Sequence, residues 1–209
     1  MSSWKLVLAS ASPARLATLR QAGVHPEVIV SGVDESGVGG AAVPEIVSLL
    51  AQRKASAVSR LLAERATLLL IGCDSLLELD GEAYGKPADS GEAIARWKRM
   101  RGRSGILHTG HHLILRREGS TCARTAVAST TVNFADLTDA EIAAYVGTGE
   151  PLQVAGAFTV DGLGGPFIAG IEGDHHNVVG LSLPLMRTML AALGLGWTDL
   201  WSTAGPGRG

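Results

Sequence analysis

The chain opens with an apolar run that leads directly into a helical pattern. Residues 6–9 (Leu-Val-Leu-Ala) form a run of strand length. Ser12 is a favourable N-cap residue, and Pro13 falls at the first helical position, where its missing N–H costs nothing. Apolar residues at helical spacing follow, and Gly23 ends the pattern. We therefore predict a buried strand followed at once by a helix.

The start of this predicted helix carries two hydroxyls and one guanidinium, from Ser10, Ser12 and Arg15. Backbone N–H groups and the positive end of the helix dipole favour an anion at such a position. Most segments of this kind are simply capped helices that follow a strand, so the segment alone leaves a purely structural role open.

Alternating strand and helix patterns continue along the chain. Strands are predicted at residues 27–31, 68–73, 76–79, 82–84, 106–109, 112–116, 126–134 and 167–171. Helices are predicted from Pro44, with Leu61 on the buried side, and at residues 89–100, 138–146 and 182–194. Asp80-Gly81 is a type I′ hairpin signal, and Asp74-Ser75 is expected to end the strand over 68–73. The pattern predicts an α/β fold.

Composition narrows the class of protein. The chain has 209 residues, 46% of them hydrophobic, which is typical of a globular protein. A net charge of −2 provides no global attraction to nucleic acid, and the apolar runs are too short to span a membrane. Two cysteines and the lack of a visible secretory signal favour a reducing, cytoplasmic location.

Charged residues recur where the predicted strands end. Asp34-Glu35 follows the second strand, Asp74 follows a central one, and Lys86 follows the hairpin, while Lys54 lies on the long helix. Carboxylates at such positions can hold a divalent metal or accept a proton from water, and lysines can neutralise phosphate oxygens. Each residue also has an ordinary alternative, as a loop acid, a turn cap or a solvated lysine. From the residues alone we infer an anion-binding α/β enzyme.

A series of short motifs adds a resemblance that covers the chain to about residue 194. In order, they are Ala-Ser-Ala-Ser-Pro-Ala-Arg from residue 9, Val33-Asp34-Glu35, Arg53-Lys54-Ala55, Gly72-Cys-Asp74-Ser, Gly85-Lys86-Pro87, Gly102-Arg103-Ser104, Ala155-Gly156-Ala157-Phe158 and Gly180-Leu-Ser-Leu-Pro184. Their order and spacing resemble the Maf family of nucleotide pyrophosphatases. The resemblance implies hydrolysis of nucleoside triphosphates, standard or modified, to the monophosphate and pyrophosphate.

The resemblance also implies a fold similar to that of the inosine-triphosphate pyrophosphatases. That fold is an elongated mixed α/β sheet flanked by helices, with a cleft between two lobes. We expect residues 1–195 to form this single two-lobed domain, with a partly disordered C-terminal tail over 196–209. We also expect a cytoplasmic homodimer that binds a nucleotide, and neither nucleic acid nor a membrane.

Roles for individual residues follow from the same resemblance. Asp74 aligns with the family's proton acceptor, and Lys54 and Lys86 complete the expected catalytic set. Ser10, Ser12, Arg15 and Arg103 are expected to face the substrate phosphates. Glu35 and Asp74 are expected to hold a divalent cation, Mg²⁺ or Mn²⁺.

Three positions depart from the branch of the family that prefers thymidine and uridine triphosphates. They are Ala14, Ser75 and Asp161, all at positions linked to base selection, so the preferred base stays open. The family was first associated with septum inhibition. A nucleotide-binding regulator of cell division, acting through a partner, is therefore the alternative function.

Overall fold

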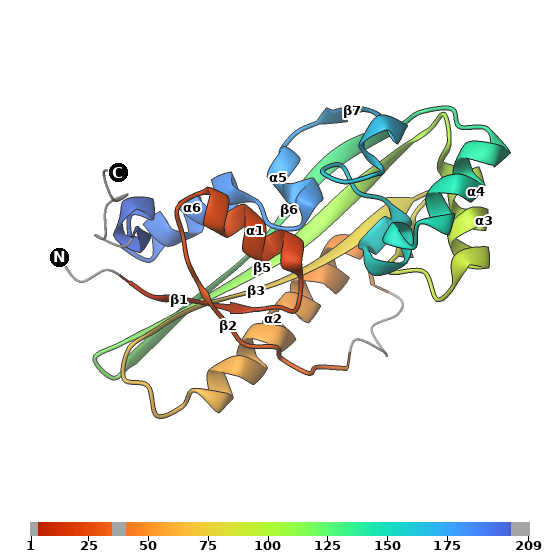
Figure 1. Ribbon diagram of the computed structural model, residues 1–209. Helices are drawn as coiled ribbons and strands as arrows, with labels where there is room; N and C mark the ends of the chain where they lie inside the picture. The colour runs from red at the N-terminus through yellow and green to blue at the C-terminus, as the bar shows by residue number, and fades with distance from the viewer. Residues whose placement is uncertain (1–3, 35–40, 202–209) are drawn as a thin grey trace, which may run out of the picture.

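The computed structural model describes residues 4–34 and 41–201, which build one mixed sheet with helices on both faces (Figure 1). The strands are β1 (Leu6–Ala9), β2 (Glu27–Val28), β3 (Leu68–Leu79), β4 (Glu82–Tyr84), β5 (Ser104–Arg117), β6 (Ser120–Phe134) and β7 (Ile168–Glu172). Their order is β2-β1-β3-β5-β6-β7, and β4 pairs with β3. β1 runs parallel to β2 and β3, whereas the other pairs are antiparallel. The predicted α/β class is confirmed.

In the described residues, six α-helices and four short 3₁₀ turns surround the sheet. The helices are α1 (Pro13–Gln21), α2 (Val43–Leu61), α3 (Ser90–Met100), α4 (Asp139–Gly147), α5 (His175–Val179) and α6 (Leu183–Ala192). The 3₁₀ turns are η1 (Glu150–Gln153), η2 (Ala155–Ala157), η3 (Gly165–Phe167) and η4 (Trp197–Leu200). Predicted caps occur at α1, α3, α4 and α6, where Ser12, Asp89, Thr138 and Ser182 each accept a backbone N–H.

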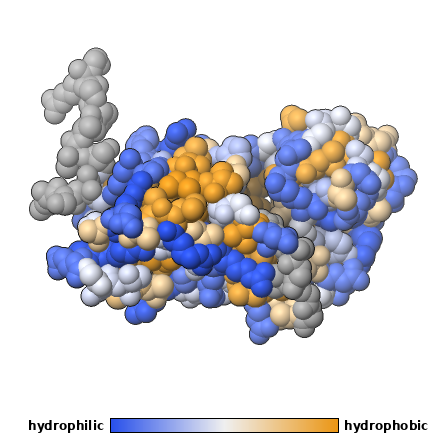
Figure 2. All heavy atoms as spheres, turned by 90° about the horizontal axis from the view of Figure 1, so that it is seen from below, coloured by the Kyte–Doolittle hydropathy of each residue, from blue (hydrophilic) through white to orange (hydrophobic). Residues whose placement is uncertain are grey.

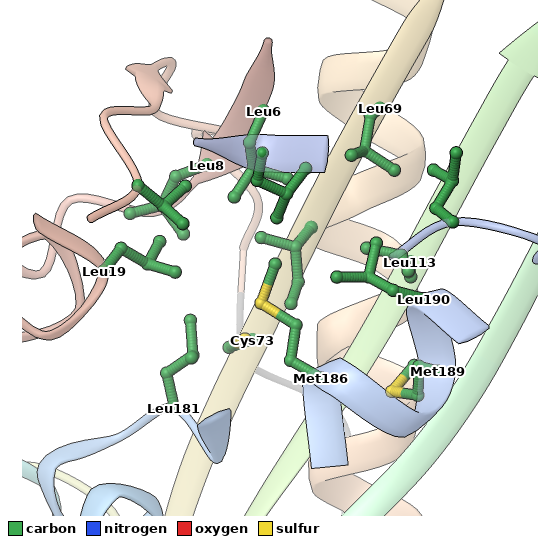
Figure 3. Close-up of a cluster of buried hydrophobic side chains, with 14 of the residues drawn as sticks. Leu6, Leu8, Leu19, Leu69, Cys73, Leu113, Leu181, Met186, Met189 and Leu190 are labelled. Atoms are coloured by element: carbon green, nitrogen blue, oxygen red, sulfur yellow. The ribbon is translucent and has the colours of Figure 1, made fainter. Parts of the chain in front are cut away.

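Within the part of the chain that the structure describes, the apolar core divides into three clusters that follow from strand alternation. On one face, Leu6, Leu8, Leu69 and neighbouring strand residues pack against α1 and α6 (Figure 3). On the other face, Val7, Leu70 and their neighbours pack against α2. The third cluster lies at the far end of β3, β5 and β6, where Trp97 and other residues of α3 and α4 form a second lobe. The sheet therefore passes through both lobes.

Glycine lets α2 approach the sheet closely. A Cβ atom at Gly72 of β3 would lie 2.6 Å from the carbonyl oxygen of Ala51, and one at Gly110 of β5 would lie 2.2 Å from that of Val47. Both distances are shorter than atoms tolerate, so these two positions need glycine for the observed packing.

Several predictions of boundaries and burial were wrong, and those for β3 and β5 share one reason. β3 runs unbroken from Leu68 to Leu79, through Asp74-Ser75, because β5 pairs with it along nearly its whole length. β5 likewise joins the two strands predicted at 106–109 and 112–116. Polar residues interrupt the apolar pattern of the sequence but not the hydrogen-bonded pairing of β3 with β5. β2 is shorter than predicted, and Leu61, expected on the buried side of α2, is 69% exposed.

The first residues of the predicted C-terminal tail are packed on the folded domain. η4 follows directly, and Leu200 is buried in the cluster of α1 and α6. The backbone N–H of Trp4 donates to the carbonyl of Asp199, and the indole N–H of Trp201 donates to that of Ala22. Along 4–34 and 41–201, no helix combines the length and the apolar character that crossing a membrane requires.

Candidate active site

A gap along one edge of β3 opens the cleft between the lobes. β1 pairs with β3 only as far as Gly72, and β4 begins to pair at Leu77. Residues 73–76 lie between them. A cleft of about 990 Å³ opens beside this gap, large enough for a nucleotide. Figure 2 shows the two lobes from below, with a hollow between them.

The cleft brings together nine of the predicted site residues. It is lined by Ser10, Ser12, Ala14, Arg15, Lys54, Asp74, Ser75, Lys86 and Asp161, which come from positions spread over 150 residues of sequence. Glu35 lies outside the described residues. Arg103 does not line the cleft.

Asp74 and Lys54 form an ion pair at the gap. Lys54 Nζ on α2 lies 2.5 Å from Asp74 Oδ1 in the middle of β3, and the two side chains are only 12% and 7% exposed. Such a charge-assisted contact between mostly buried groups holds both in a defined geometry. The close packing of α2 on Gly72 brings Lys54 within reach of the carboxylate.

Arg15 is bound to the protein through most of its donors. Nε donates to the carbonyl of Gly180 at 2.7 Å. Nη1 donates to the Cys73 carbonyl at 2.9 Å and to Ser10 Oγ at 3.1 Å, while Nη2 donates to Ser75 Oγ at 2.9 Å. A guanidinium has five N–H donors, so one N–H on Nη2 remains for a ligand. Arg15 therefore lines the cleft and also joins β1, β3 and the turn before α6.

The two serines shape the start of α1. Ser12 Oγ accepts the backbone N–H of Arg15 at 3.4 Å, and Ser10 Oγ accepts that of Ser12 at 3.2 Å. The predicted N-cap is thus confirmed. Together they present the N-terminus of α1, with its positive dipole end, to the cleft.

Ser75 donates its hydroxyl proton inward. Its oxygen lies 2.9 Å from Thr109 Oγ1, and Thr109 donates in turn to the carbonyl of Asn177 at 3.2 Å. The one hydroxyl proton of Thr109 is used in that contact, so Ser75 is the donor to Thr109. Ser75 consequently offers a ligand only the remaining acceptor capacity of its oxygen.

His111 is a buried residue that the sequence interpretation did not single out. Its Nδ1 contacts the Thr109 carbonyl at 3.0 Å, and its Nε2 contacts the backbone N–H of Ser182 at 2.9 Å. A carbonyl only accepts and an N–H only donates, so the ring is neutral with its proton on Nδ1. Burial, aided by the charge of Arg15, lowers the pKa of His111 to about 4.

Arg103 lies at the hairpin instead of the cleft. Its guanidinium pairs with the carboxylate of Asp80, at 2.5 Å for the shorter contact, and both side chains are about half exposed. The hydrogen bond from Arg103 lowers the pKa of Asp80. The neighbouring cations of α3 also meet acids, because Lys98 pairs with Asp139 and Arg99 with Glu82.

The described part of the chain contains no group of three or more His, Cys, Asp or Glu side chains placed to hold a metal. Of the two predicted metal ligands, Asp74 lines the cleft, and Glu35 lies outside the described residues. Mg²⁺ commonly binds through one or two carboxylates together with substrate phosphates and water. The Asp74 carboxylate, in a cleft large enough for a nucleotide, fits such a cation as its protein ligand.

A second cavity lies away from these residues. It measures about 500 Å³ and lies at the opposite end of β1 and β3, beside Trp4, Arg65 and Arg117. None of the predicted site residues that the structure describes lines it, and nine of them line the larger cleft.

The chain is similar to known proteins over most of its length. The chain matches the family described as Maf-like protein over residues 5–193. It is 60% identical to a nucleoside triphosphate pyrophosphatase of Salinispora tropica over 95% of this chain and 88% of that protein. It is 58% identical to a nucleoside triphosphate pyrophosphatase of Streptomyces coelicolor over 96% of both.

A solved structure, the Ham1 protein of Staphylococcus aureus, aligns with 63% of this chain and 72% of its own at 14% identity. The TM-score of 0.36 is too low to establish a shared fold. The match over residues 5–193 and the identities of 58–60% over nearly the full length do establish kinship. The chain belongs to the Maf-like protein family.

Proposed function

We propose that this protein is a nucleoside triphosphate pyrophosphatase, which converts a nucleoside triphosphate and water to the monophosphate and pyrophosphate. One observation carries the proposal: the mostly buried Asp74–Lys54 pair, 2.5 Å apart, lies in a nucleotide-sized cleft beside the N-terminus of α1. The curated relatives at 58–60% identity carry the same activity in their names.

In this proposal Asp74 accepts a proton from the attacking water. The water oxygen bonds to phosphorus as the anhydride bond between the α- and β-phosphates breaks, and pyrophosphate leaves with that bond's electron pair. Lys54 neutralises negative charge that develops on the phosphates, and it orients Asp74 through their contact. Lys86, the start of α1 and the remaining N–H of Arg15 bind the other phosphate oxygens.

A divalent cation, Mg²⁺ or Mn²⁺, fits this scheme with Asp74 as a ligand. When bound, it would polarise the phosphate oxygens and stabilise the negative charge that develops on them during the reaction. Glu35 remains a proposed second carboxylate. We also propose, as predictions for solution studies, that the enzyme is a cytoplasmic homodimer and that modified nucleotides are among its substrates.

Pyrophosphate release tests the proposal. The purified protein would be given a panel of nucleoside triphosphates with Mg²⁺ or Mn²⁺, and Asp74→Asn would be assayed beside it. This substitution keeps the shape of the side chain but removes its charge, and loss of a general base typically costs about 10²–10⁴ in rate. Asp136→Asn, at an exposed position outside the cleft, is the matched control.

Each outcome separates the alternatives. Turnover by the wild type that collapses in Asp74→Asn supports the enzyme. Near wild-type turnover in Asp74→Asn would overturn the role of this carboxylate. Nucleotide binding without any hydrolysis would favour the regulator of cell division instead.

A further inference from the structure

The carboxylate of Glu150 accepts several hydrogen bonds from one loop of the second lobe, residues 159–164. Oε1 accepts from Thr159 Oγ1 at 2.5 Å and from the backbone N–H of Gly164 at 3.1 Å, and Oε2 accepts from that of Leu163 at 3.0 Å. The hydroxyl of Tyr145 donates to Oε1 at 3.0 Å. Burial acts to raise the pKa of Glu150, but these hydrogen bonds outweigh it and the pKa is lowered. The ionised carboxylate thus fixes both ends of residues 159–164.

The loop is fitted closely around this carboxylate. A Cβ atom at Gly162 would lie 2.6 Å from Glu150 Oε2, and one at Gly164 would lie 2.3 Å from Tyr145 Oη. Only glycine at both positions permits the observed contacts. The Tyr145 ring packs edge-on against Trp97, with centroids 5.5 Å apart and planes at 81°. Glu150 therefore ties the loop to the core of the second lobe.

The same loop forms one side of the cleft. Phe158, Thr159, Val160 and Asp161 line it, together with residues at the start of α1. Of the lining residues after position 150, Asp161 is the one with a charged side chain, and that charge is negative. Triphosphate oxygens are attracted to Lys54, Lys86 and the N-terminus of α1 and repelled by this carboxylate. The loop side is therefore suited to the uncharged nucleoside end of a substrate.

We propose that Glu150 is a positioning residue for nucleoside binding: it holds the Thr159–Asp161 side of the cleft in the shape that receives the base and sugar. This inference rests on the proposed pyrophosphatase function. Glu150 does not line the cleft, so it acts through Thr159 and the loop backbone. Loss of Glu150 should weaken binding of the nucleoside half of the substrate. Binding and reaction of the phosphates should be unaffected.

Glu150→Gln tests this division. The amide keeps the size of the side chain but replaces one acceptor oxygen with a donor that opposes the loop N–H groups. We expect KM for nucleoside triphosphates to rise at least about tenfold, equal to about 1.4 kcal/mol, while kcat changes less than about twofold. Inorganic triphosphate, which lacks a nucleoside, should inhibit the variant and the wild type with the same Ki. Glu64→Gln, at an exposed position outside the cleft, is the matched control.

Other results would overturn the inference. If Glu150→Gln lowered the melting temperature but left KM unchanged, Glu150 would be only structural. If KM and the Ki of inorganic triphosphate rose together, the whole cleft would be distorted. Should this variant fail to fold, Tyr145→Phe removes one donor to Glu150 and keeps the ring, and it should raise KM in the same direction. A wild type that releases no pyrophosphate would refute the proposed function itself, before any variant is compared.

Discussion

Arg15 Nε donates to the carbonyl oxygen of Gly180 at 2.7 Å, across 165 residues of sequence. The contact joins the first helix to the turn before α6. Its guanidinium is only partly available to a substrate, because Ser10, Ser75 and the Cys73 carbonyl accept three further hydrogen bonds from it. Arg15 therefore has a structural role beside the phosphate-binding role that we propose for it.

Arg15→Ala should lower both stability and affinity. The buried carbonyls of Gly180 and Cys73 would lose their donor, at about 1–3 kcal/mol each. Loss of a charge-assisted phosphate contact should weaken triphosphate binding by roughly 1.5–3 kcal/mol. Urea unfolding and KM, measured on one preparation, separate the two effects. An unchanged KM with lower stability would show that Arg15 only supports the structure.

Gly72→Ala should disturb the Asp74–Lys54 pair without altering either residue. The new methyl group would meet the Ala51 carbonyl at 2.6 Å and push α2 away from the sheet. Overpacking of this kind typically lowers the free energy of unfolding by about 1–3 kcal/mol. We also expect turnover to fall, because Lys54 would move away from Asp74. Gly147→Ala is the matched control, because nothing lies within 4 Å of the new carbon there. If Gly72→Ala kept full turnover, the spacing of α2 would not govern the site.

His111 predicts a loss of stability in acid. Its pKa is 6.5 when unperturbed and about 4 in the folded chain. Between these values the unfolded chain binds a proton at His111 that the folded chain does not, so stability falls as the pH drops through this window. Below about pH 4 both states are protonated and this loss levels off. A difference from 6.5 to about 4 corresponds to about 3 kcal/mol.

His111→Gln isolates this contribution from that of the carboxylates. Glutamine keeps an acceptor for the Ser182 N–H but does not titrate. Chemical unfolding of both proteins at several pH values should show a smaller acid loss in the variant. Parallel pH profiles for the two proteins would contradict the assignment.

Base choice is predicted from Ala14, Ser75 and Asp161. A site with alanine instead of arginine at position 14 and a carboxylate at position 161 offers acceptors in place of donors. Acceptors suit the N–H and NH₂ groups of guanine better than they suit thymine or uracil. We therefore expect no strong preference for dTTP or UTP over GTP or 7-methyl-GTP. Comparing kcat/KM for these four nucleotides decides the point. A hundredfold preference for a pyrimidine would refute this interpretation and leave the pyrophosphatase proposal intact.

Local signals in the sequence were sufficient for the first strand, the first helix and its cap. An apolar run, Ser12 and Pro13 act within a few residues of one another, so their effect is visible without the rest of the chain. Asp74-Ser75 was mistaken for the end of a strand, because the ladder with β5 that extends β3 is a tertiary property. The pairing of Arg103 with Asp80 could not be predicted for the same reason, because folding brings the two residues together.

The candidate site shows the same division. The residue types of Lys54, Asp74 and Lys86 suggested phosphate chemistry, and the fold lines one cleft with all three. Glu150 and His111 were missed because their roles depend on partners brought near by folding. The close spacing of Gly162 and Gly164 was the one local sign that a backbone must approach another group there.

β3, β5 and β6 pass without a break from one lobe to the other. The lobes are therefore not two bodies that swing on a linker. Widening the cleft would require bending or twisting hydrogen-bonded ladders, such as the β3–β5 pairing from Leu68 to Glu78. The width of the cleft is thus an elastic property of the sheet, and adaptation to different nucleotides falls to side chains and loops at its margins.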